Sequence, residues 1–541
     1  KKHSNLIDWI CEVLGSRWVE NAFKNRLCHR LAEFYSIHTL LYRIQSLFPA
    51  DQFIFYPRVN VQLYQDMKNL VEDAGGQLFE IQKFRLSWRS RWISWIENAV
   101  QEIYVLLIIL VQWGGSLLLL AHKKRSKKPV KDYQLAILVI APQRQLNPNQ
   151  RRADFLVDDR KVFSKDTIYF TQTDLTEVQK EALKNLGNSY AVPRAKDFFG
   201  GFTWWNKLLG KALLFRNLLA YEEIKLTYIV LSRYLIWKEV LSQFRIGHFV
   251  THCDFGAPHI GRNIALQQAG VQTWYFTDAV NYPGLAKTNP YGKPCRHPFW
   301  TYLTYDHFVT WADFAVNFFS SHPQSIQNYH VVGCLWASCF QTPKEENKPY
   351  QKEFLIAVFD TGYTLNGDGC FEEGIAFAKD ILKLADDFPD SLILFKQKFA
   401  GPEPFLRTDQ VLGRQLVEEY QKMQSHPRIK FLSHEKSPAE VIGMSDLTVS
   451  FPFTSTTFEA LSMNKFGLWH DPCDLYRNSM YGRTGELTTH GYAQLKNKIA
   501  EIKDKGTKNL DDIFYANPEL FDPYHDGKAL ERFQDLLLTE T

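Results

Sequence analysis

The chain has 541 residues, of which 45% are hydrophobic and 23% are charged, and its formal net charge is only +4. This length predicts at least two domains, and the composition is typical of a folded protein. The small net charge provides no large basic field, so we expect no nucleic-acid partner. The cysteines form no CxxC pair, so the sequence predicts no zinc or iron–sulfur site.

An apolar segment lies in the first third of the chain, at residues 103–121, and contains no charged residue. A basic run follows it, with Lys123, Lys124, Arg125, Lys127 and Lys128. The length is borderline for a membrane-spanning helix, which needs about 20 apolar residues. The segment could also form a buried helix, or lie in the membrane interface with the basic run on anionic headgroups. We expect the interfacial position, in a cytoplasmic protein bound peripherally at the inner face of the cytoplasmic membrane.

Short apolar segments alternate with helical patterns through the first part of the chain. Two of the helical patterns, 175–187 and 261–270, end in glycine, the usual helix C-cap signal. Uniformly apolar strands that alternate with helices predict a doubly wound parallel sheet, and we assign it to a first domain of residues 1–341. The expected strands are 52–57, 77–81, 134–141, 166–171, 248–253, 273–278, 307–311 and 329–333.

A polar, proline-bearing segment, residues 342–352, predicts a linker between domains. The same alternation then resumes, so we assign residues 353–525 to a second α/β domain and 526–541 to a C-terminal helix. Ligands of such sheets bind beyond the C-terminal ends of the strands, which places the expected site in a cleft between the domains. The expected strands are 354–360, 391–397, 428–433, 446–451 and 465–472, and the expected helices are 371–389, 414–427, 437–445 and 456–464.

Four consecutive hydroxyl residues, 454–457, follow the fourth of these strands and begin the next helix. Backbone N–H groups at a helix start bind anions, and the hydroxyls of Thr454, Ser455 and Thr456 would add donors without adding charge. Glu459, one turn later, could accept hydrogen bonds from ribose hydroxyls. The turn therefore predicts a nucleotide phosphate site. The simpler alternative is helix capping by Thr456 with Glu459, which fits the S/T-x-x-E capping box.

Pro452, Phe453, Thr454 and Ser455 spell PFTS, which resembles the signature of a bacterial family, the polysaccharide biosynthesis PFTS-motif proteins. The wider segment, residues 445–471, resembles the donor-binding segment of GT-B glycosyltransferases. This resemblance implies a GT-B-like α/β fold, with two doubly wound Rossmann-like domains facing a central cleft. The residues in matching places are Asp446, Ser450, Thr454, Ser455, Glu459, Ala460, Leu461 and Lys465.

The resemblance also implies an activity in bacterial surface polysaccharide biosynthesis, such as that of capsule or lipopolysaccharide. The expected enzyme is a metal-independent glycosyltransferase without a cofactor. It moves a sugar from a nucleotide-sugar donor to a lipid-linked or growing glycan acceptor. A polyol-phosphate transferase or a sugar-nucleotide epimerase would use the same architecture, although an epimerase needs neither acceptor nor membrane. A non-catalytic carbohydrate-binding scaffold is the third alternative.

Three further strand ends in the second domain are expected to contact the nucleotide-sugar. Thr361 and Gly362 follow the first strand, where glycine lets the backbone approach a phosphate closely. Lys396 and Lys398 end the second strand on one face, so both could reach one diphosphate. His434 follows the third strand, near the turn at which GT-B enzymes often bind the base. An ordinary turn and solvated lysines would explain the same residues without a ligand.

In the first domain, the loop after the strand expected at 248–253 is the richest in polar side chains. An inverting transferase needs a base for the acceptor hydroxyl and cations near the leaving diphosphate. We predict Asp254 as that base and His259 as the second choice, with helix capping by Asp254 as the alternative. The predicted acceptor contacts are Arg262, Asp278 and Asn281.

Overall fold

The computed structural model describes Asn21 and residues 131–139, 166–171, 175–185, 189–191, 222–252, 254–256, 258–277, 300–335, 353–363, 369–399, 401, 403–434, 436–505, 522–524 and 526–539. Several sequence predictions lie outside these residues: the strands at 52–57 and 77–81, the apolar segment 103–121 with its basic run, the linker at 342–352, and the acceptor contacts Asp278 and Asn281. Within the described part of the chain, none of the helices combines the length and the apolar character needed to span a bilayer.

The first domain contains a parallel sheet that has seven strands among the described residues, in the order β3-β2-β1-β4-β5-β6-β7. Strands β2, β5 and β6 are almost wholly buried, and β1 is buried from Leu135 to Val139, where its sequence becomes continuously apolar. The strands are β1 (Lys131–Val139), β2 (Thr167–Thr171), β3 (Ser189–Ala191), β4 (Phe244–Thr251), β5 (Gln272–Phe276), β6 (His307–Thr310) and β7 (Asn328–Val331).

The second domain contains a parallel sheet that has six strands among the described residues, in the order β10-β9-β8-β11-β12-β13. Two parallel α/β sheets in two domains confirm the predicted fold class. The strands are β8 (Phe354–Phe359), β9 (Ser391–Lys396), β10 (Ile429–Phe431), β11 (Leu447–Ser450), β12 (Phe466–Asp471) and β13 (Thr488–His490).

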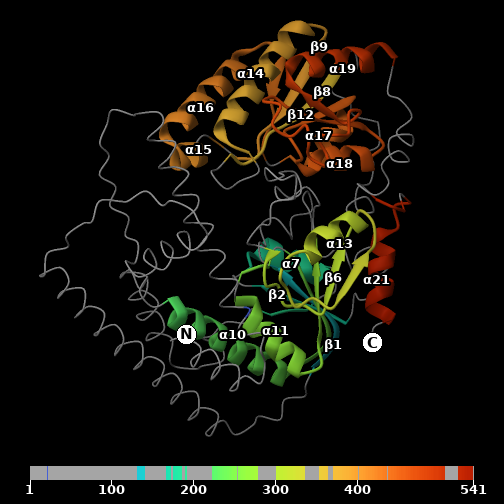
Figure 1. Ribbon diagram of the computed structural model, residues 1–541. Coiled ribbons are helices and arrows are strands. Elements are labelled where there is room, and N and C mark those ends of the chain that lie inside the picture. Colours follow the sequence, from blue (N-terminus) through green and yellow to red (C-terminus); the bar gives the residue numbers. More distant parts are fainter. Residues whose placement is uncertain are drawn as a thin grey trace, which may run out of the picture.

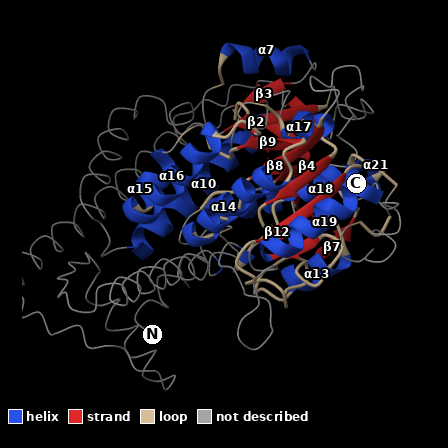
Figure 2. Cartoon of the chain, turned by 90° about the horizontal axis from the view of Figure 1, so that it is seen from above, coloured by secondary structure: helices blue, strands red, loops and turns tan. Residues whose placement is uncertain are grey.

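Helices cover both faces of each sheet (Figure 1 and Figure 2). In the first domain, α10 and α11 pack on one face, and α13 and α21 pack on the other. In the second domain, α17 and α18 pack on one face, and α14, α16 and α19 on the other. The described helices are α7 (Glu177–Asn185), α10 (Glu222–Gln243), α11 (Pro258–Gln268), α13 (Asp313–Ser320), α14 (Phe371–Asp387), α15 (Glu403–Thr408), α16 (Gln410–Ser425), α17 (Pro438–Met444), α18 (Ser455–Ser462), α19 (Gly491–Lys505) and α21 (Ala529–Thr539).

Strand β8 shows why the sequence of a doubly covered strand is continuously apolar. Leu355 and Ala357 belong to the cluster that α17 and α18 cover, whereas Ile356 and Val358 belong to the cluster on the α14 side. Successive side chains of a strand point to opposite faces, so burial of both faces requires an apolar residue at every position.

Each sheet has a topological switch point. Among the described strands of each sheet, the first is an inner strand, the next ones follow outward to one edge, and the remaining ones lie on the other side of the first. The reversal lies between β1 and β4 in the first sheet and between β8 and β11 in the second. Beyond the C-terminal ends of strands at such a point a crevice opens, and ligands of open α/β sheets bind there.

The two domains touch through aromatic side chains at these strand ends. Trp311, which directly follows β6, packs edge-on against Phe458 of α18 with ring centroids 5.9 Å apart. Phe314 of α13 packs in the same way against Tyr481 at 6.2 Å. The turn between β11 and α18 therefore belongs to the edge of the second domain that faces the first.

The chain returns to the first domain at its C-terminal end. Helix α21, red in Figure 1, packs beside the first sheet, with the Phe533 ring 6.1 Å from Trp274 and 6.0 Å from Phe276. Asp522 accepts a hydrogen bond from the backbone N–H of Cys334 at 2.8 Å. The two domains are thus connected twice along the sequence.

Candidate functional site

The PFTS turn connects β11 to α18 at the switch point of the second sheet. Phe453 adopts a left-handed backbone conformation with φ of 60°, which is uncommon for a residue with a large side chain. Its ring is 3% exposed and lies 5.6 Å from Trp469, 5.4 Å from Tyr476 and 5.4 Å from Tyr481. Although the sequence places Phe453 in the nucleotide site, the structure makes its side chain an aromatic anchor for the turn. Pro452 beside it is also buried.

The hydroxyl groups of this turn bond mainly to the turn itself. The Thr456 hydroxyl lies 2.7 Å from that of Ser450 and 3.1 Å from that of Thr454. The Thr454 hydroxyl also donates to the carbonyl of Phe451 at 3.1 Å, and Thr457 donates to the carbonyl of Leu468 at 3.2 Å. These bonds fix the shape of the turn, while the side chains of Thr454 and Ser455 remain half-buried.

Helix α18 begins without the side-chain cap that the sequence offered as the simpler explanation. Its N-cap residue is Thr454, and the Thr454 side chain makes no capping hydrogen bond. Glu459 accepts a hydrogen bond from the Ser455 hydroxyl at 2.9 Å, in place of a capping box with Thr456. An uncapped helix start presents N–H donors and a positive dipole end, which together suit an anion.

Two neighbouring helices of the same domain are capped in the ordinary way. Asp409 accepts from the N–H groups of Val411 and Leu412 at the start of α16. Ser437 and Glu440 form a reciprocal capping box at the start of α17. The start of α18 therefore differs from both, although it is rich in residues that favour capping.

The structure brings Lys396, Lys398, Gly362 and His434 together at the same edge. The Lys396 ammonium donates to the carbonyl oxygen of His434 at 3.3 Å. Burial lowers the pKa of Lys396, while the carboxylates of Asp360 and Glu459 act in the opposite direction. The Lys398 ammonium lies 3.6 Å from the point that a Cβ atom of Gly362 would occupy. Three strand ends, those of β8, β9 and β10, thus contribute to one cluster.

Asp360 lies at the centre of this cluster and was not singled out from the sequence. Its carboxylate accepts from the backbone N–H of Lys398 at 2.6 Å and from the Tyr420 hydroxyl at 2.7 Å. Burial raises the pKa of Asp360 to about 6. The signal that could have found it is a carboxylate directly after a buried strand. Thr361, the next residue, is 1% exposed, so its side chain lies inside the domain.

In the first domain, Asp254 and Arg262 form a buried ion pair. Arg262 also donates to the Tyr305 hydroxyl at 3.2 Å, and Tyr305 donates to the carbonyl oxygen of Asp254 at 2.8 Å. Burial by itself would raise the pKa of Asp254, but the Arg262 guanidinium and, less strongly, His259 hold it below its ordinary value. Such a carboxylate is a weak base. Arg262, predicted as an acceptor contact, is only 4% exposed.

His259 is engaged on both ring nitrogens. Nδ1 lies 2.6 Å from the carbonyl oxygen of Gly256 and must donate to it, which leaves Nε2 to accept from the N–H and hydroxyl of Thr304 at 3.3 and 3.0 Å. The ring stacks on Tyr305, and burial lowers the pKa of His259 to about 4. Asp254 and His259 thus hold the loop after β4 together, and a base role for either stays a prediction.

Residues 209–499, more than half of the chain, match the family model described as polysaccharide biosynthesis PFTS motif protein. The chain belongs to this PFTS-motif family. The matched region includes both the Asp254 cluster and the PFTS turn. Among curated proteins, no sequence matches the chain.

Solved structures similar to this PFTS-motif protein share little sequence with it. A UDP-GlcNAc 2-epimerase from Neisseria meningitidis bound to UDP-GlcNAc is 12% identical, with a TM-score of 0.46 over 75% of this chain and 99% of that chain. A glycosyltransferase from Rickettsia africae is 11% identical, with a TM-score of 0.45 over 76% and 100%. Anabaena HepE in complex with UDP and glucose is 12% identical, with a TM-score of 0.46 over 75% and 100%.

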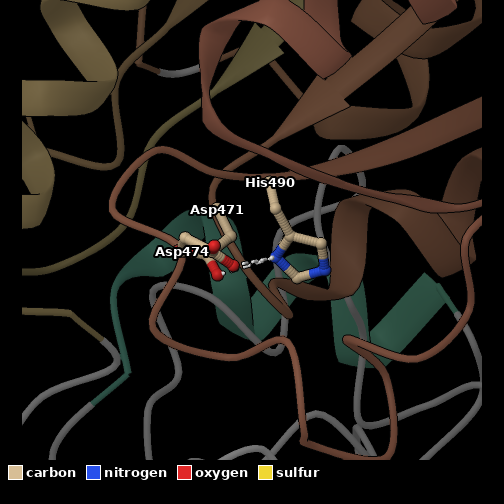
Figure 3. Close-up of side chains that lie close together, drawn as sticks. All are labelled: Asp471, Asp474 and His490. Atoms are coloured by element: carbon tan, nitrogen blue, oxygen red, sulfur yellow. Dashed lines mark hydrogen bonds and ion pairs between the residues drawn. The ribbon is translucent and has the colours of Figure 1, made fainter.

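A third polar cluster of the PFTS-motif protein, Asp471, Asp474 and His490, resembles a metal site because its oxygen and nitrogen atoms lie within 4.8 Å of one another (Figure 3). Nδ1 of His490 lies 3.0 Å from a carboxylate oxygen of Asp471, and Nε2 lies 2.9 Å from the carbonyl oxygen of Gly482. Each ring nitrogen of His490 therefore has an oxygen partner inside the protein, and His490 and Asp471 form an ion pair. The expectation of a metal-independent site stays a prediction.

Proposed function

We propose that this PFTS-motif protein is a metal-independent glycosyltransferase that transfers a sugar from a nucleotide-sugar donor to a glycan or lipid-linked acceptor during polysaccharide biosynthesis. One observation carries the proposal. At the switch point of the second sheet, α18 starts beside the strand ends that carry Lys396, Lys398 and Gly362, and Glu459 of α18 acts electrostatically on Lys396. Membership of the family supports a role in polysaccharide biosynthesis, and the geometry of this sheet edge supports binding of a nucleotide-sugar donor.

The proposed diphosphate site combines three sources of positive potential. The N-terminus of α18 carries about half a unit charge. Lys398 is exposed and lies over the turn at Gly362, while Lys396 lies deeper, between Asp360 and Glu459. Stabilisation of the leaving diphosphate by such prearranged groups is a major contribution to glycosyl transfer. These groups can neutralise a diphosphate without a metal ion, so we propose a metal-independent site.

The proposed ribose contact is Glu459. Its carboxylate is buried, and it accepts from the Ser455 hydroxyl one turn earlier. A ribose hydroxyl could replace that donor without leaving a buried charge unsatisfied. We place the acceptor on the side of the first domain, where Arg262, Asp278 and Asn281 remain the proposed contacts. Trp311 of that domain packs against Phe458 of α18, which brings the first domain next to the proposed donor site.

A thermal-shift screen with CMP, CDP, UDP and GDP tests the donor site. A nucleotide at 100 times its dissociation constant should stabilise the protein by about 2.7 kcal/mol. The double variant Ser455→Ala/Glu459→Ala should lose this stabilisation. The matched control is Ser437→Ala/Glu440→Ala, which removes the same pair of residue types from the start of α17. Equal nucleotide affinity in the parent and the Ser455/Glu459 variant would contradict the proposed site.

An acceptor-dependence assay separates the transferase from the other enzymes that this fold could support. A transferase releases the nucleotide quickly only when a glycan or lipid-linked acceptor is present. An epimerase would convert the sugar nucleotide alone, and a binding scaffold would bind the nucleotide-sugar without turnover. Acceptor-independent conversion would therefore overturn the transferase proposal while leaving the nucleotide site intact.

We propose peripheral contact with an anionic membrane surface through the apolar segment 103–121 and the basic run after it. Each basic residue near such a surface contributes about 1 kcal/mol. Replacing the five basic residues with Ser should release the protein from phosphatidylglycerol-containing liposomes, most clearly at low salt. If the parent protein does not sediment with these liposomes, the membrane contact is wrong. The residues replaced are Lys123, Lys124, Arg125, Lys127 and Lys128.

A further inference from the structure

The loop between β12 and β13, residues 472–487, packs over the PFTS turn. Tyr476 and Tyr481 of this loop each lie 5.4 Å from the Phe453 ring. Tyr481 also packs on Phe458, one turn into α18, at 5.8 Å. Two aromatic side chains of the loop therefore contact both the turn and the helix of the proposed donor site.

Asp471 and His490 hold this loop at both of its ends. They are the last residues of neighbouring strands, β12 and β13, and they face each other in the sheet register. The Asp471 carboxylate accepts from the backbone N–H groups of Leu475 at 3.2 Å and Tyr476 at 2.9 Å. Nε2 of His490 lies 2.9 Å from the carbonyl oxygen of Gly482, and Nδ1 lies 3.0 Å from the Asp471 carboxylate. The ion pair of Asp471 and His490 (Figure 3) thus contacts both an early and a later part of the loop.

The loop has little freedom to pack differently while this ion pair is intact. A Cβ atom at position 482 would lie 1.8 Å from the carbonyl oxygen of Tyr476, so only glycine fits at the point where the loop closes on itself. The Tyr476 hydroxyl donates to Glu373 of α14, which fixes the loop to a second element. Tyr476 and Tyr481 are therefore held in place from outside the PFTS turn.

This packing accounts for the backbone of Phe453. A left-handed conformation at a bulky residue is unfavourable, and it persists only where the surroundings enforce it. The enforcing contacts are the rings of Trp469, Tyr476 and Tyr481. Two of these three rings belong to the loop that the ion pair holds.

We propose that Asp471 and His490 are positioning residues of the donor site. Their ion pair holds residues 472–487 over Phe453, and this contact holds the PFTS turn and the start of α18 in the conformation that binds the diphosphate. The inference rests on the proposed function for its ligand, but the link from the ion pair to the turn is a property of the structure alone.

A neighbouring histidine provides a matched control. His470 precedes Asp471 on β12 and is fully buried, with its nitrogens 3.1 Å from Asp380 of α14 and 3.1 Å from the Thr489 hydroxyl. His470 and Asp380 also form a histidine–aspartate pair, but the partners of His470 lie on α14 and β13 and not in the loop. His490→Gln and His470→Gln therefore both remove a buried pair, and only the first releases the loop.

The experiment compares amide hydrogen exchange at residues 453–457 in the parent and the two variants, together with the dissociation constants for CMP, CDP, UDP and GDP. In His490→Gln we expect exchange at 453–457 to accelerate and affinity for the bound nucleotide to fall about tenfold, as after loss of one charge-assisted hydrogen bond. In His470→Gln the exchange rates at 453–457 and the nucleotide affinity should match those of the parent, even if the midpoint of thermal unfolding falls as much as in His490→Gln. Should His490→Gln not fold, Asp471→Asn replaces it, because asparagine retains one acceptor for the loop.

The outcomes separate this inference from the proposed function. Equal exchange at 453–457 in both histidine variants, or no change in His490→Gln, overturns the link between the ion pair and the turn. Faster exchange with unchanged nucleotide affinity overturns the positioning role. If the parent binds none of the four nucleotides, the proposed donor site fails, and the exchange rates alone still decide whether the ion pair holds the turn.

Discussion

The strand ends of the two sheets carry similar side chains and use them differently. After β4, Asp254 and Arg262 pair directly with each other, and their side chains are only 12% and 5% exposed. At the edge of the second sheet, Lys398 is exposed, Thr454 and Ser455 are half-buried, and α18 starts without a side-chain cap. A polar cluster at the C-terminal edge of a sheet is therefore not enough to define a ligand site. What matters is whether its groups satisfy one another or remain accessible.

The largest expected effect tests whether the charged groups of the Asp254 cluster satisfy one another. Arg262→Met should lower the free energy of unfolding by about 3–5 kcal/mol, because it leaves the Asp254 carboxylate buried without its cation. Urea unfolding at neutral pH measures the change. Lys398→Met, at the exposed position of the second cluster, should change the free energy of unfolding by less than about 0.5 kcal/mol. Similar losses in the two variants would remove the contrast between the clusters.

Asp254→Asn tests whether Asp254 serves as the predicted general base or only as the ion-pair partner of Arg262. A general base contributes about 100- to 10,000-fold to the rate, so that role requires loss of turnover with unchanged stability. The contacts of Asp254 predict the opposite: lower stability, with turnover per folded molecule largely retained. A collapse of turnover in a fully stable variant would restore Asp254 as the base.

The carboxylates of the two clusters should also respond to pH in opposite directions. Burial raises the pKa of Asp360 to about 6, so between about pH 4 and 6 the folded protein holds a proton that the unfolded chain has released. The free energy of unfolding should therefore fall as the pH rises through this window, by about 3 kcal/mol. The pKa of Asp254 is lowered, so its stabilisation is present above the unfolded value and is lost as the pH falls.

Asp360→Asn should abolish the pH dependence assigned to Asp360. The asparagine oxygen can still accept from the Lys398 N–H, and its amide can donate to the Tyr420 oxygen, so the packing is preserved. Urea unfolding at several pH values between 4 and 7 compares the variant with the parent. An unchanged slope in the variant would show that Asp360 does not titrate in this range.

The smallest expected effect concerns the two lysines at the end of β9. Lys396→Met and Lys398→Met should each weaken nucleotide binding about 10- to 100-fold, the range for a lost charge-assisted hydrogen bond. The control is Lys422→Met, which removes a lysine paired with Glu419 on α16. Isothermal titration with the nucleotide that binds the parent gives the constants. If Lys422→Met weakens binding as much as the other two, the effect is one of net charge and not of the site.

Local sequence patterns predicted most of the described fold. Strands with four or more consecutive apolar residues, such as β8 and β9, were found because burial on both faces makes them continuously apolar. The strands β3 and β13 were missed, since their sequences, SYA and TTH, contain no apolar run. Helix α19 was also missed, although Leu495, Ile499 and Ile502 are buried at helical spacing and could have revealed it.

The sequence by itself determined that hydroxyl residues stand where β11 passes into α18, and that lysines end β9, because these are properties of neighbouring residues. Only the tertiary structure decided that the Phe453 ring is an anchor, that Arg262 donates to the Tyr305 hydroxyl, and that Asp471 pairs with His490. Each of these outcomes depends on a partner distant along the chain: Tyr481 for Phe453, Tyr305 for Arg262, and the neighbouring strand for Asp471. Periodicity and capping patterns report interactions within a few residues, whereas burial and charge pairing depend on which distant segments the fold brings together.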